Sequence, residues 1–330
     1  MLDNKKRLQY IDIIKGVAII LVVLAHLIQT NVVDGVHDEV FQFINSFHMP
    51  LFFFASGYIA VKTCRLDDIR GGCLFVNNKL RSLILPLLIW TLFVNRYFLS
   101  SSWTSLTIED LIVCLTKPGL WFLLTLFKIS ILFGVLHLIS KRLRDRWYID
   151  SILFLVTVGL LIWLKQMSDA LYFIFYSIGV FVAKYHMVEK KFQSPKVIAV
   201  ASVSFLILVT HWQIEGTYID DILKLTIAPC AFIMFLHFSK IAEGSRVGEW
   251  LSTIGQHSLA VYIIHWNFLK IFDEYQIPED MINPFWLFLM MWLIAVLITY
   301  VVVVISKAIS FNKYLSFLLL GKRIRKDYKI

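Results

Sequence analysis

About ten long apolar segments constrain the fold of this chain more than any other feature of its sequence. A helix needs about 20 consecutive, mainly apolar residues to cross the hydrocarbon core of a bilayer. Segments of this kind lie near residues 10–30, 43–63, 80–100, 120–140, 147–164, 168–186, 194–212, 220–239, 250–272 and 284–309. The composition agrees, because 58% of the 330 residues are hydrophobic, only 17% are charged and the mean hydropathy is +0.73. The sequence therefore predicts an all-α, polytopic membrane bundle of about ten transmembrane helices.

Charged residues between the segments predict the orientation of the bundle. Alternate connections are basic, at Lys5, Lys6, Arg7, Arg65, Arg70, Lys79, Arg81, Lys141, Arg142, Arg144, Arg146, Lys184, Lys190, Lys191, Lys196 and in the tail after residue 320. The intervening connections are often acidic, at Asp34, Asp38, Glu39, Glu109, Asp110, Glu215, Asp220, Asp221, Asp273, Glu274, Glu279 and Asp280. Because basic loops stay on the cytoplasmic side, we expect both termini in the cytoplasm and a multi-pass protein of the cytoplasmic (inner) membrane. This topology explains the net charge of +9 and gives no reason to expect nucleic acid as a partner.

The chain shows no repeat, low-complexity stretch or long Pro/Gly-rich linker that would divide it. We therefore expect a single integral membrane domain over residues 1–330, with basic cytoplasmic tails at 1–9 and 310–330. The first apolar segment has no small-residue cleavage pattern, so we expect it to remain as a signal anchor. The four cysteines and the histidines outside the motifs below lack metal-ligand spacing, which predicts free thiols and no metal.

The first apolar segment carries three ionisable residues, Asp12, Lys15 and His26. Such residues cost several kcal/mol inside a bilayer unless they face protein, water or a ligand, which makes function the first hypothesis. At ~100° and ~1.5 Å per residue, the rotation from Lys15 to His26 is about 1100°, within ~20° of three full turns. Both side chains therefore lie on one helical face, roughly 16 Å apart along the axis.

Each of these residues also has a purely structural interpretation. Lys15 can extend to the cytoplasmic interface, and Asp12, three residues earlier, can be its ion-pair partner. A histidine in the outer part of a span, such as His26, is often a hydrogen-bonding residue between helices.

The pattern of Lys15, ten residues and His26 resembles the first helix of the membrane acyltransferase family 3 proteins. The segments 47–58 (FHMPLFFFASGY), 79–86 (KLRSLILP) and 255–265 (GQHSLAVYIIH) resemble the second helix, the basic start of the third and the penultimate helix of that family. Lys15 in place of arginine, together with segment 47–58, looks most like the branch of fucose 4-O-acetylase-related sugar O-acetyltransferases.

The resemblance implies an O-acyltransferase that moves an acyl group, usually acetyl from cytoplasmic acetyl-CoA, to a hydroxyl of a glycan or lipid-linked sugar. Such chemistry needs a base for the hydroxyl proton and cations for the CoA phosphates. His26 suits the general base, since an unperturbed imidazole titrates near pH 6.5. We expect Lys15, Lys79 and Arg81 to hold CoA, because a guanidinium binds phosphate with two parallel hydrogen bonds. Asp12 either orients Lys15 or is structural.

Four further residues are candidates for the acceptor side: His48, Trp121, Tyr262 and His265. Tyr262 and His265 share one helical face with Ser258, at spacings of three and four residues. The structural alternatives are a backbone group freed by Pro50 for His48, an interfacial aromatic position for Trp121, and hydrogen bonds between helices for the others.

A transporter or exporter of a lipid-linked or polymeric glycan is the rival interpretation, because intramembrane Asp, Lys and His can also line a path. The absence of a two-half repeat and of paired helices interrupted by Gly or Pro argues against an ordinary secondary transporter.

Overall fold

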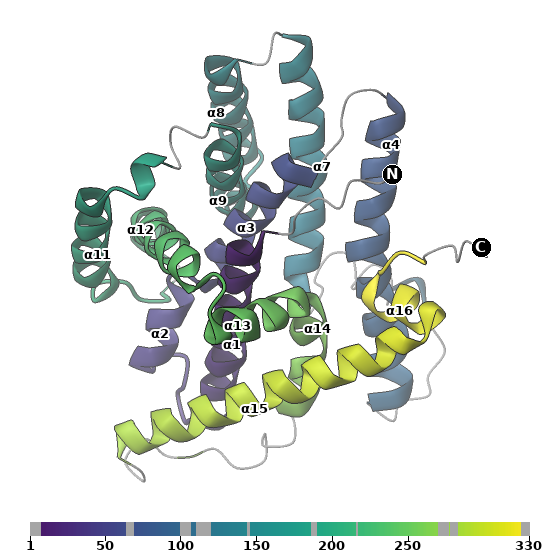
Figure 1. Cartoon of the computed structure of the whole chain (residues 1–330), viewed down its shortest axis with the longest axis vertical. Coiled ribbons are helices and arrows are strands. Elements are labelled where there is room, and N and C mark those ends of the chain that lie inside the picture. The colour runs from purple at the N-terminus through teal and green to yellow at the C-terminus, as the bar shows by residue number, and fades with distance from the viewer. Residues whose placement is uncertain are drawn as a thin grey trace. The chain divides into compact units, whose positions relative to one another are not determined.

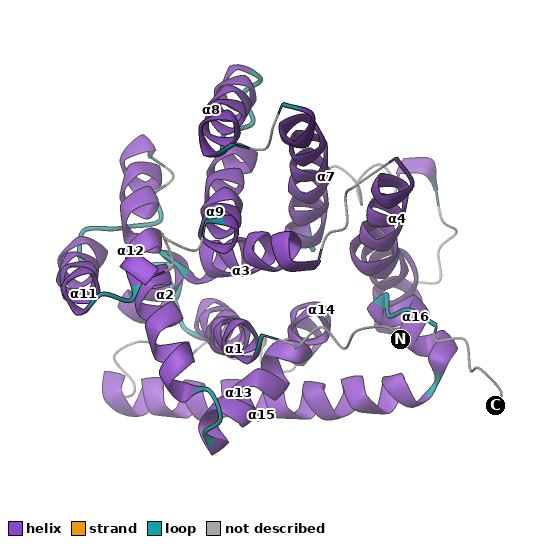
Figure 2. Ribbon diagram, turned by 45° about the horizontal axis from the view of Figure 1, so that its top comes forward, coloured by secondary structure: helices purple, strands orange, loops and turns teal. Residues whose placement is uncertain are grey.

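The structure is a computed structural model that describes residues 8–63, 69–99, 107–109, 120–143, 146–185, 190–215, 217–269, 277 and 283–324. The described segments are helices joined by turns and short connections, apart from an isolated bridge between Val32 and Ile277 (Figures 1 and 2). The helices are α1 Gln9–Asn31, α2 Glu39–Asn45, α3 His48–Thr63, α4 Ile69–Lys79, η1 Leu80–Ile84, α5 Leu85–Leu88, η2 Ile89–Leu99, α7 Trp121–Arg142, α8 Trp147–Trp163, α9 Met167–Lys184, α11 Pro195–Val209, α12 Tyr218–Ala242, α13 Arg246–Gln256, α14 Ser258–Leu269, α15 Pro284–Phe311 and α16 Lys313–Leu320. The parts of the predicted tails at 1–7 and 325–330 lie outside the described residues.

Seven of the ten predicted membrane spans are confirmed by length and composition. Seven helical stretches of the described residues are long and apolar enough to cross a membrane: Gln9–Asn31, Glu39–Lys62, Arg70–Val94, Trp121–Arg142, Met167–Lys184, Tyr218–Ala242 and Pro284–Phe311. Three shorter apolar helices, Trp147–Trp163, Pro195–Val209 and Ser258–Leu269, occupy the remaining predicted positions. The chain is thus an all-α, multi-pass membrane protein with about ten hydrophobic helices. The cytoplasmic location of its termini stays a prediction.

Two predicted spans differ from what we expected. The segment 250–272 is not one helix, because the chain breaks at His257 into α13 and α14. The third span begins near residue 70, ten residues earlier than predicted, and contains the two π-helical stretches η1 and η2. Pro86, between them, has no backbone N–H to donate, which interrupts the regular hydrogen-bond ladder.

The chain forms two compact units. The first comprises Met1–Val61 and Phe175–Val304, and the second comprises Lys62–Ile174 and Ile305–Ile330. The expectation of a single membrane domain stays a prediction. Among the cysteines, Cys73 and Cys230 are free thiols as predicted, while Cys64 and Cys114 lie outside the described residues.

Helix α1 forms the core of the first unit, where it packs along α13, α14, α12 and α2 (Figures 1 and 2). Glycines bring α1 and α13 into backbone contact: a Cβ on Gly16 would lie 2.1 Å from the Leu251 carbonyl oxygen, and one on Gly255 would lie 1.8 Å from that of Asp12. Close approach through small residues is the usual way in which membrane helices gain van der Waals contact.

The directions of the helices follow from contacts at the two ends of α1. Near its start, the Tyr10 hydroxyl lies 2.7 Å from the Tyr58 hydroxyl, which is late in α3. Near its end, His26 interacts electrostatically with His48, the first residue of α3. Helix α3 therefore runs antiparallel to α1. The chain from Gly255, beside Asp12, to His265, beside His26, advances in the same direction as α1.

In the second unit, α16 packs against α5 and η2, and α7 packs against α4, η1 and α8. The Trp90 indole N–H donates to the Leu319 carbonyl oxygen at 2.9 Å, and the Lys128 ammonium pairs with the Asp169 carboxylate at 3.0 Å. The first of these contacts holds the short helix α16 against the broken third span, and the second joins α7 to α9.

Candidate functional site

A cluster of histidines lies in the first unit, around the end of α1 that carries His26. The His26 ring stacks on the His265 ring, with centroids 5.4 Å apart and planes 29° apart, and meets the Trp266 ring edge to face at 5.0 Å. His48 is also close enough to interact electrostatically with His26. The structure therefore brings together three histidines that the sequence analysis singled out on three separate segments.

Gln29 orients the His26 ring. The Nδ1 atom of His26 lies 2.9 Å from the Oε1 atom of Gln29, one turn later on α1. Because an amide oxygen can only accept a hydrogen bond, Nδ1 carries the proton and Nε2 keeps its lone pair. No described residue forms a hydrogen bond with that Nε2 atom. His26 is thus held in the tautomer that a general base requires, by a residue that sequence reasoning missed although its spacing of three residues was visible.

His265 offers a second nitrogen lone pair in the same cluster. Its Nδ1–H donates to the Val261 carbonyl oxygen at 2.9 Å, which leaves Nε2 as an acceptor. That Nε2 atom is buried and has no hydrogen-bond partner among the described residues, and only 3% of the residue is exposed. An unsatisfied buried polar atom typically costs about 1–3 kcal/mol, so the position favours a hydrogen-bond donor such as a hydroxyl or a water. The Tyr262 ring, also buried, lies 6.2 Å from the His265 ring.

His48 links the cluster to two neighbouring helices. Its Nδ1–H donates to the Ile44 carbonyl oxygen of α2 at 2.8 Å, and the side chain is buried. It also interacts electrostatically with Lys224 of α12. The Lys224 ammonium lies 4.9 Å from the centroid of the Trp212 ring. Sequence reasoning missed Lys224, although a lysine within an apolar segment is itself a functional signal.

The other end of α1 holds the Asp12–Lys15 pair. The Lys15 ammonium lies 2.6 Å from an Asp12 carboxylate oxygen, and the side chains are 18% and 4% exposed, respectively. The ion pair considered from the sequence is therefore present, and the role of Lys15 toward CoA stays a prediction. A further cation that the sequence analysis did not identify is nearby, because the Lys240 ammonium lies 5.1 Å from the Tyr10 ring centroid.

The remaining candidates, Lys79, Arg81 and Trp121, belong to the second unit. The Arg81 Nε–H donates to the Gly321 carbonyl oxygen at 3.2 Å, so η1 of the third span contacts the segment after α16. Arg81 and Arg323 lie close enough for their like charges to repel each other. Two guanidinium groups so placed favour an anion between them. Arg323 had been assigned only to the basic tail.

Lys79 and Trp121 were each considered from the sequence either as a ligand-binding residue or as a residue of the membrane interface. The Lys79 ammonium lies 5.5 Å from the Phe75 ring centroid on α4. Trp121 is the first residue of α7, is 37% exposed and has its ring centroid 5.3 Å from that of Tyr172. Neither contact distinguishes a ligand-binding role from an interfacial one.

No group of three or more His, Cys, Asp or Glu side chains within the described part of the chain is arranged to hold a metal ion.

The fold and the histidine cluster together define a class of protein: multi-pass membrane proteins with a base-competent, partly buried histidine among their helices. Residues 8–307 match the acyltransferase domain of acyltransferase family 3, and the chain belongs to that family. It is 31% identical over 140 residues to nodulation protein NolL of Sinorhizobium fredii, a match covering 39% of this chain and 37% of that protein. It is 33% identical over 91 residues to nodulation protein NolL of Mesorhizobium japonicum, covering 26% and 23% of the two chains. The matches thus span less than half of either curated relative. No solved structure matches the chain.

Proposed function

We propose that this protein is a membrane O-acyltransferase of the cytoplasmic membrane, which moves an acetyl group from acetyl-CoA to a hydroxyl of a glycan or lipid-linked sugar. The observation that carries the proposal is the Gln29–His26 hydrogen bond, which leaves the Nε2 atom of His26 available as a base. Membership of the acyltransferase family supports the same reaction class.

In the proposed reaction, the Nε2 atom of His26 takes the proton of the acceptor hydroxyl as its oxygen attacks the thioester carbonyl carbon. The resulting tetrahedral intermediate collapses, the carbon–sulfur bond breaks and the CoA thiolate leaves. The His26 imidazolium then returns its proton to that thiolate. Throughout the cycle, Nδ1–H continues to donate to Gln29, which keeps the ring oriented.

His265 is proposed to position the acceptor. Its Nε2 lone pair, buried and without a partner among the described residues, would receive a hydrogen bond from a second hydroxyl of the sugar. Because the His265 and His26 rings are stacked, that bond would place the sugar beside the base.

The CoA moiety is proposed to bind cationic side chains. Lys15 remains a candidate, although Asp12 offsets part of its charge. In the second unit, Arg81 and its neighbour Arg323 supply two guanidinium groups for phosphate, and Lys79 is on the adjoining turn.

The proposal is tested by incubating purified protein with acetyl-CoA that carries ¹⁴C in its acetyl group. The two readouts are release of the free CoA thiol and transfer of the label to added glycosides. His26→Ala should lower turnover by ~10²–10⁴-fold, the usual contribution of a general base. Gln29→Leu should lower kcat about fivefold, since one hydrogen bond of about 1 kcal/mol is lost, and ¹⁵N shifts of labelled histidine should report a mixed tautomer at His26.

His237→Ala is the matched control, because His237 lies in a hydrophobic helix and, among the described residues, forms a ring contact with its neighbour Phe238 but no hydrogen bond or ion pair. Turnover of His26→Ala within a few-fold of wild type would overturn the assignment of the base. Wild-type protein that moves a glycan across a vesicle membrane without thioester turnover would be a transporter instead.

A further inference from the structure

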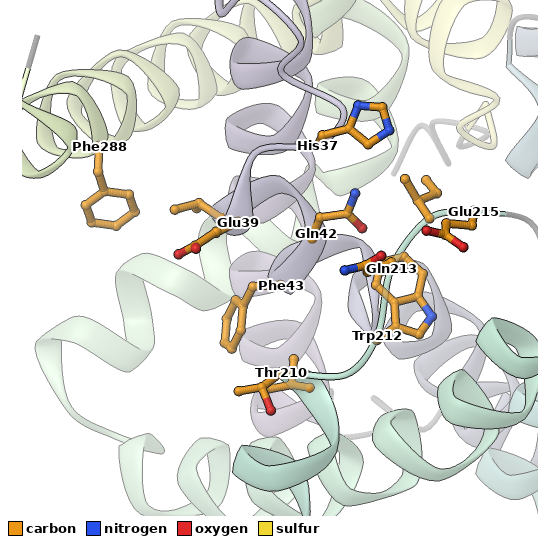
Figure 3. Close-up of a pocket in the computed structure, with 12 residues that line it drawn as sticks. His37, Glu39, Gln42, Phe43, Thr210, Trp212, Gln213, Glu215 and Phe288 are labelled. Carbon is orange, nitrogen blue, oxygen red and sulfur yellow. The ribbon is translucent and has the colours of Figure 1, made fainter. Parts of the chain in front are cut away.

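A pocket of about 700 Å³ lies in the first unit, beside α2 (Figure 3). Its walls come from α2, from the connection between α11 and α12, and from the start of α15. The positions of basic residues predict that these connections face away from the cytoplasm. The volume is in the range of small-molecule sites.

The polar wall of the pocket matches the hydroxyl groups of a sugar. The Gln42 Nε2–H donates to the Val36 carbonyl oxygen at 2.7 Å, which fixes the amide and directs its Oε1 atom as an acceptor. That Oε1 atom is buried and has no hydrogen-bond partner among the described residues. The carboxamides of Gln42 and Gln213 point toward one another in Figure 3. A hydroxyl can donate to one amide and accept from the other.

An aromatic side chain forms the adjacent wall. Phe43, next to Gln42 on α2, is 40% exposed. Its ring is held edge to face by Phe47 at 5.4 Å and by Phe205 at 5.7 Å. A rigid, exposed aromatic ring beside fixed amides can pack against the C–H face of a pyranose while the amides bind its hydroxyls.

The charge of the pocket selects among sugars. The carboxylates of Glu39 and Glu215 line it, and no lysine or arginine is among its described lining residues. Like charges disfavour a uronate, a sulfate or a phosphate here, and the same argument excludes CoA. Neutral sugars and sugars that carry an amino group remain as candidate ligands of the pocket.

The pocket adjoins the histidine cluster through both of its walls. The Ile44 carbonyl oxygen of α2, two residues after Gln42, accepts the hydrogen bond of His48. From the other wall, the Trp212 ring contacts Lys224, whose charge interacts with His48. Both the pocket and His48 therefore contact α2, and the loops that form the pocket are predicted to face the side from which the acceptor is expected.

From these contacts we propose that the pocket binds a neutral or amino-bearing sugar unit of the acceptor glycan and thereby selects the acceptor. This inference rests on the proposed acyltransferase function, which it deepens by assigning the acceptor class and a binding site. Gln42, Phe43 and Gln213 bind the ring, and Glu39 and Glu215 reject acidic sugars.

Saturation-transfer NMR on the full-length protein in nanodiscs tests this site directly, with methyl β-D-glucoside, methyl β-D-glucosaminide and methyl β-D-glucuronide as probes. We expect the first two to bind and the glucuronide to bind several-fold more weakly. Gln42→Met and Gln213→Ala should each weaken glucoside binding about tenfold, because each removes one hydrogen bond. The double variant Glu39→Gln/Glu215→Gln should remove the discrimination against glucuronide.

Gln166→Ala, at an exposed glutamine between α8 and α9, is the matched control and should bind all three probes as wild type does. Gln213 is exposed, so Gln213→Ala is informative even where Gln42→Met fails to fold. Acceptor-independent hydrolysis of acetyl-CoA should be unchanged in Gln166→Ala. Glycoside binding that is indifferent to Gln213→Ala, in protein whose thioester turnover depends on His26, would overturn this site alone. If wild-type protein does not turn over the thioester, the proposed function is overturned, whether or not the glycosides bind.

Discussion

At the residue scale, a histidine becomes a base through its neighbours. The Nδ1 atoms of His26, His48 and His265 all have acceptors, from a side-chain amide in the first case and from backbone carbonyls in the other two. Each ring therefore presents an Nε2 lone pair, and the cluster is built to accept protons or hydrogen bonds. One bound molecule with adjacent hydroxyl groups, such as a sugar, could donate hydrogen bonds to more than one of these Nε2 atoms.

The unsatisfied Nε2 atom of His265 leads to a prediction that separates function from stability. His265→Phe keeps an aromatic ring of similar shape but removes the acceptor, and replacing an unsatisfied buried polar atom by an apolar one is close to neutral for folding. We expect thermal unfolding of the detergent-solubilised variant within a few degrees of wild type, while the KM for the acceptor rises about tenfold. An unchanged KM, or an unfolding temperature that falls by much more than a few degrees, would show that His265 has a structural role. His237→Phe is the control.

At the scale of elements, the site depends on how α13 and α14 follow α1. The glycine contact sets the spacing of α1 and α13 at Asp12 and Gly16, and the break at His257 then carries α14 to His26. The Asp12–Lys15 ion pair lies at the same level of α1 as this contact.

Gly255→Ala should therefore destabilise the protein, since its Cβ would overlap the Asp12 carbonyl oxygen. Overpacking of this kind costs ~1–3 kcal/mol, and we expect a clearly lower unfolding temperature together with lower activity. Gly159→Ala is the matched control, because a Cβ there meets nothing within 4 Å and alanine is the better helix former. Equal stability of the two variants would mean that α1 and α13 are free to separate.

A second element-scale prediction concerns α16, which places Arg323 near Arg81. Arg81→Ala, Arg323→Ala and Lys15→Ala should each weaken CoA binding measured by isothermal titration. Arg81→Lys should restore only part of it, because an ammonium cannot reproduce a planar, two-point contact. Arg246→Ala, at an exposed arginine that begins α13, is the control. CoA affinity unaffected in all three variants would leave these residues with a purely topological role.

At the scale of the whole molecule, sidedness follows from the direction of α1. With a cytoplasmic N-terminus, Lys15 lies near the inner face and His26 roughly 16 Å further out along the helix. Donor and acceptor would then approach from opposite sides of the membrane. In sealed inside-out vesicles, acetyl-CoA added outside should label an acceptor enclosed in the lumen. Label confined to acceptor on the same side as acetyl-CoA would contradict this arrangement without affecting the reaction class.

The sequence by itself determined the apolar helices, because whether about 20 residues can cross a bilayer depends on the residues themselves and hardly on the rest of the chain. It likewise determined that Lys15 and His26 share a helical face, which needs only the helical period. Only the tertiary structure placed His265 and Trp266 against His26, broke the ninth span at His257, and set Gln42 opposite Gln213. These features arise from packing between segments far apart in the chain, and a period read along one segment carries no information about which other segment it meets.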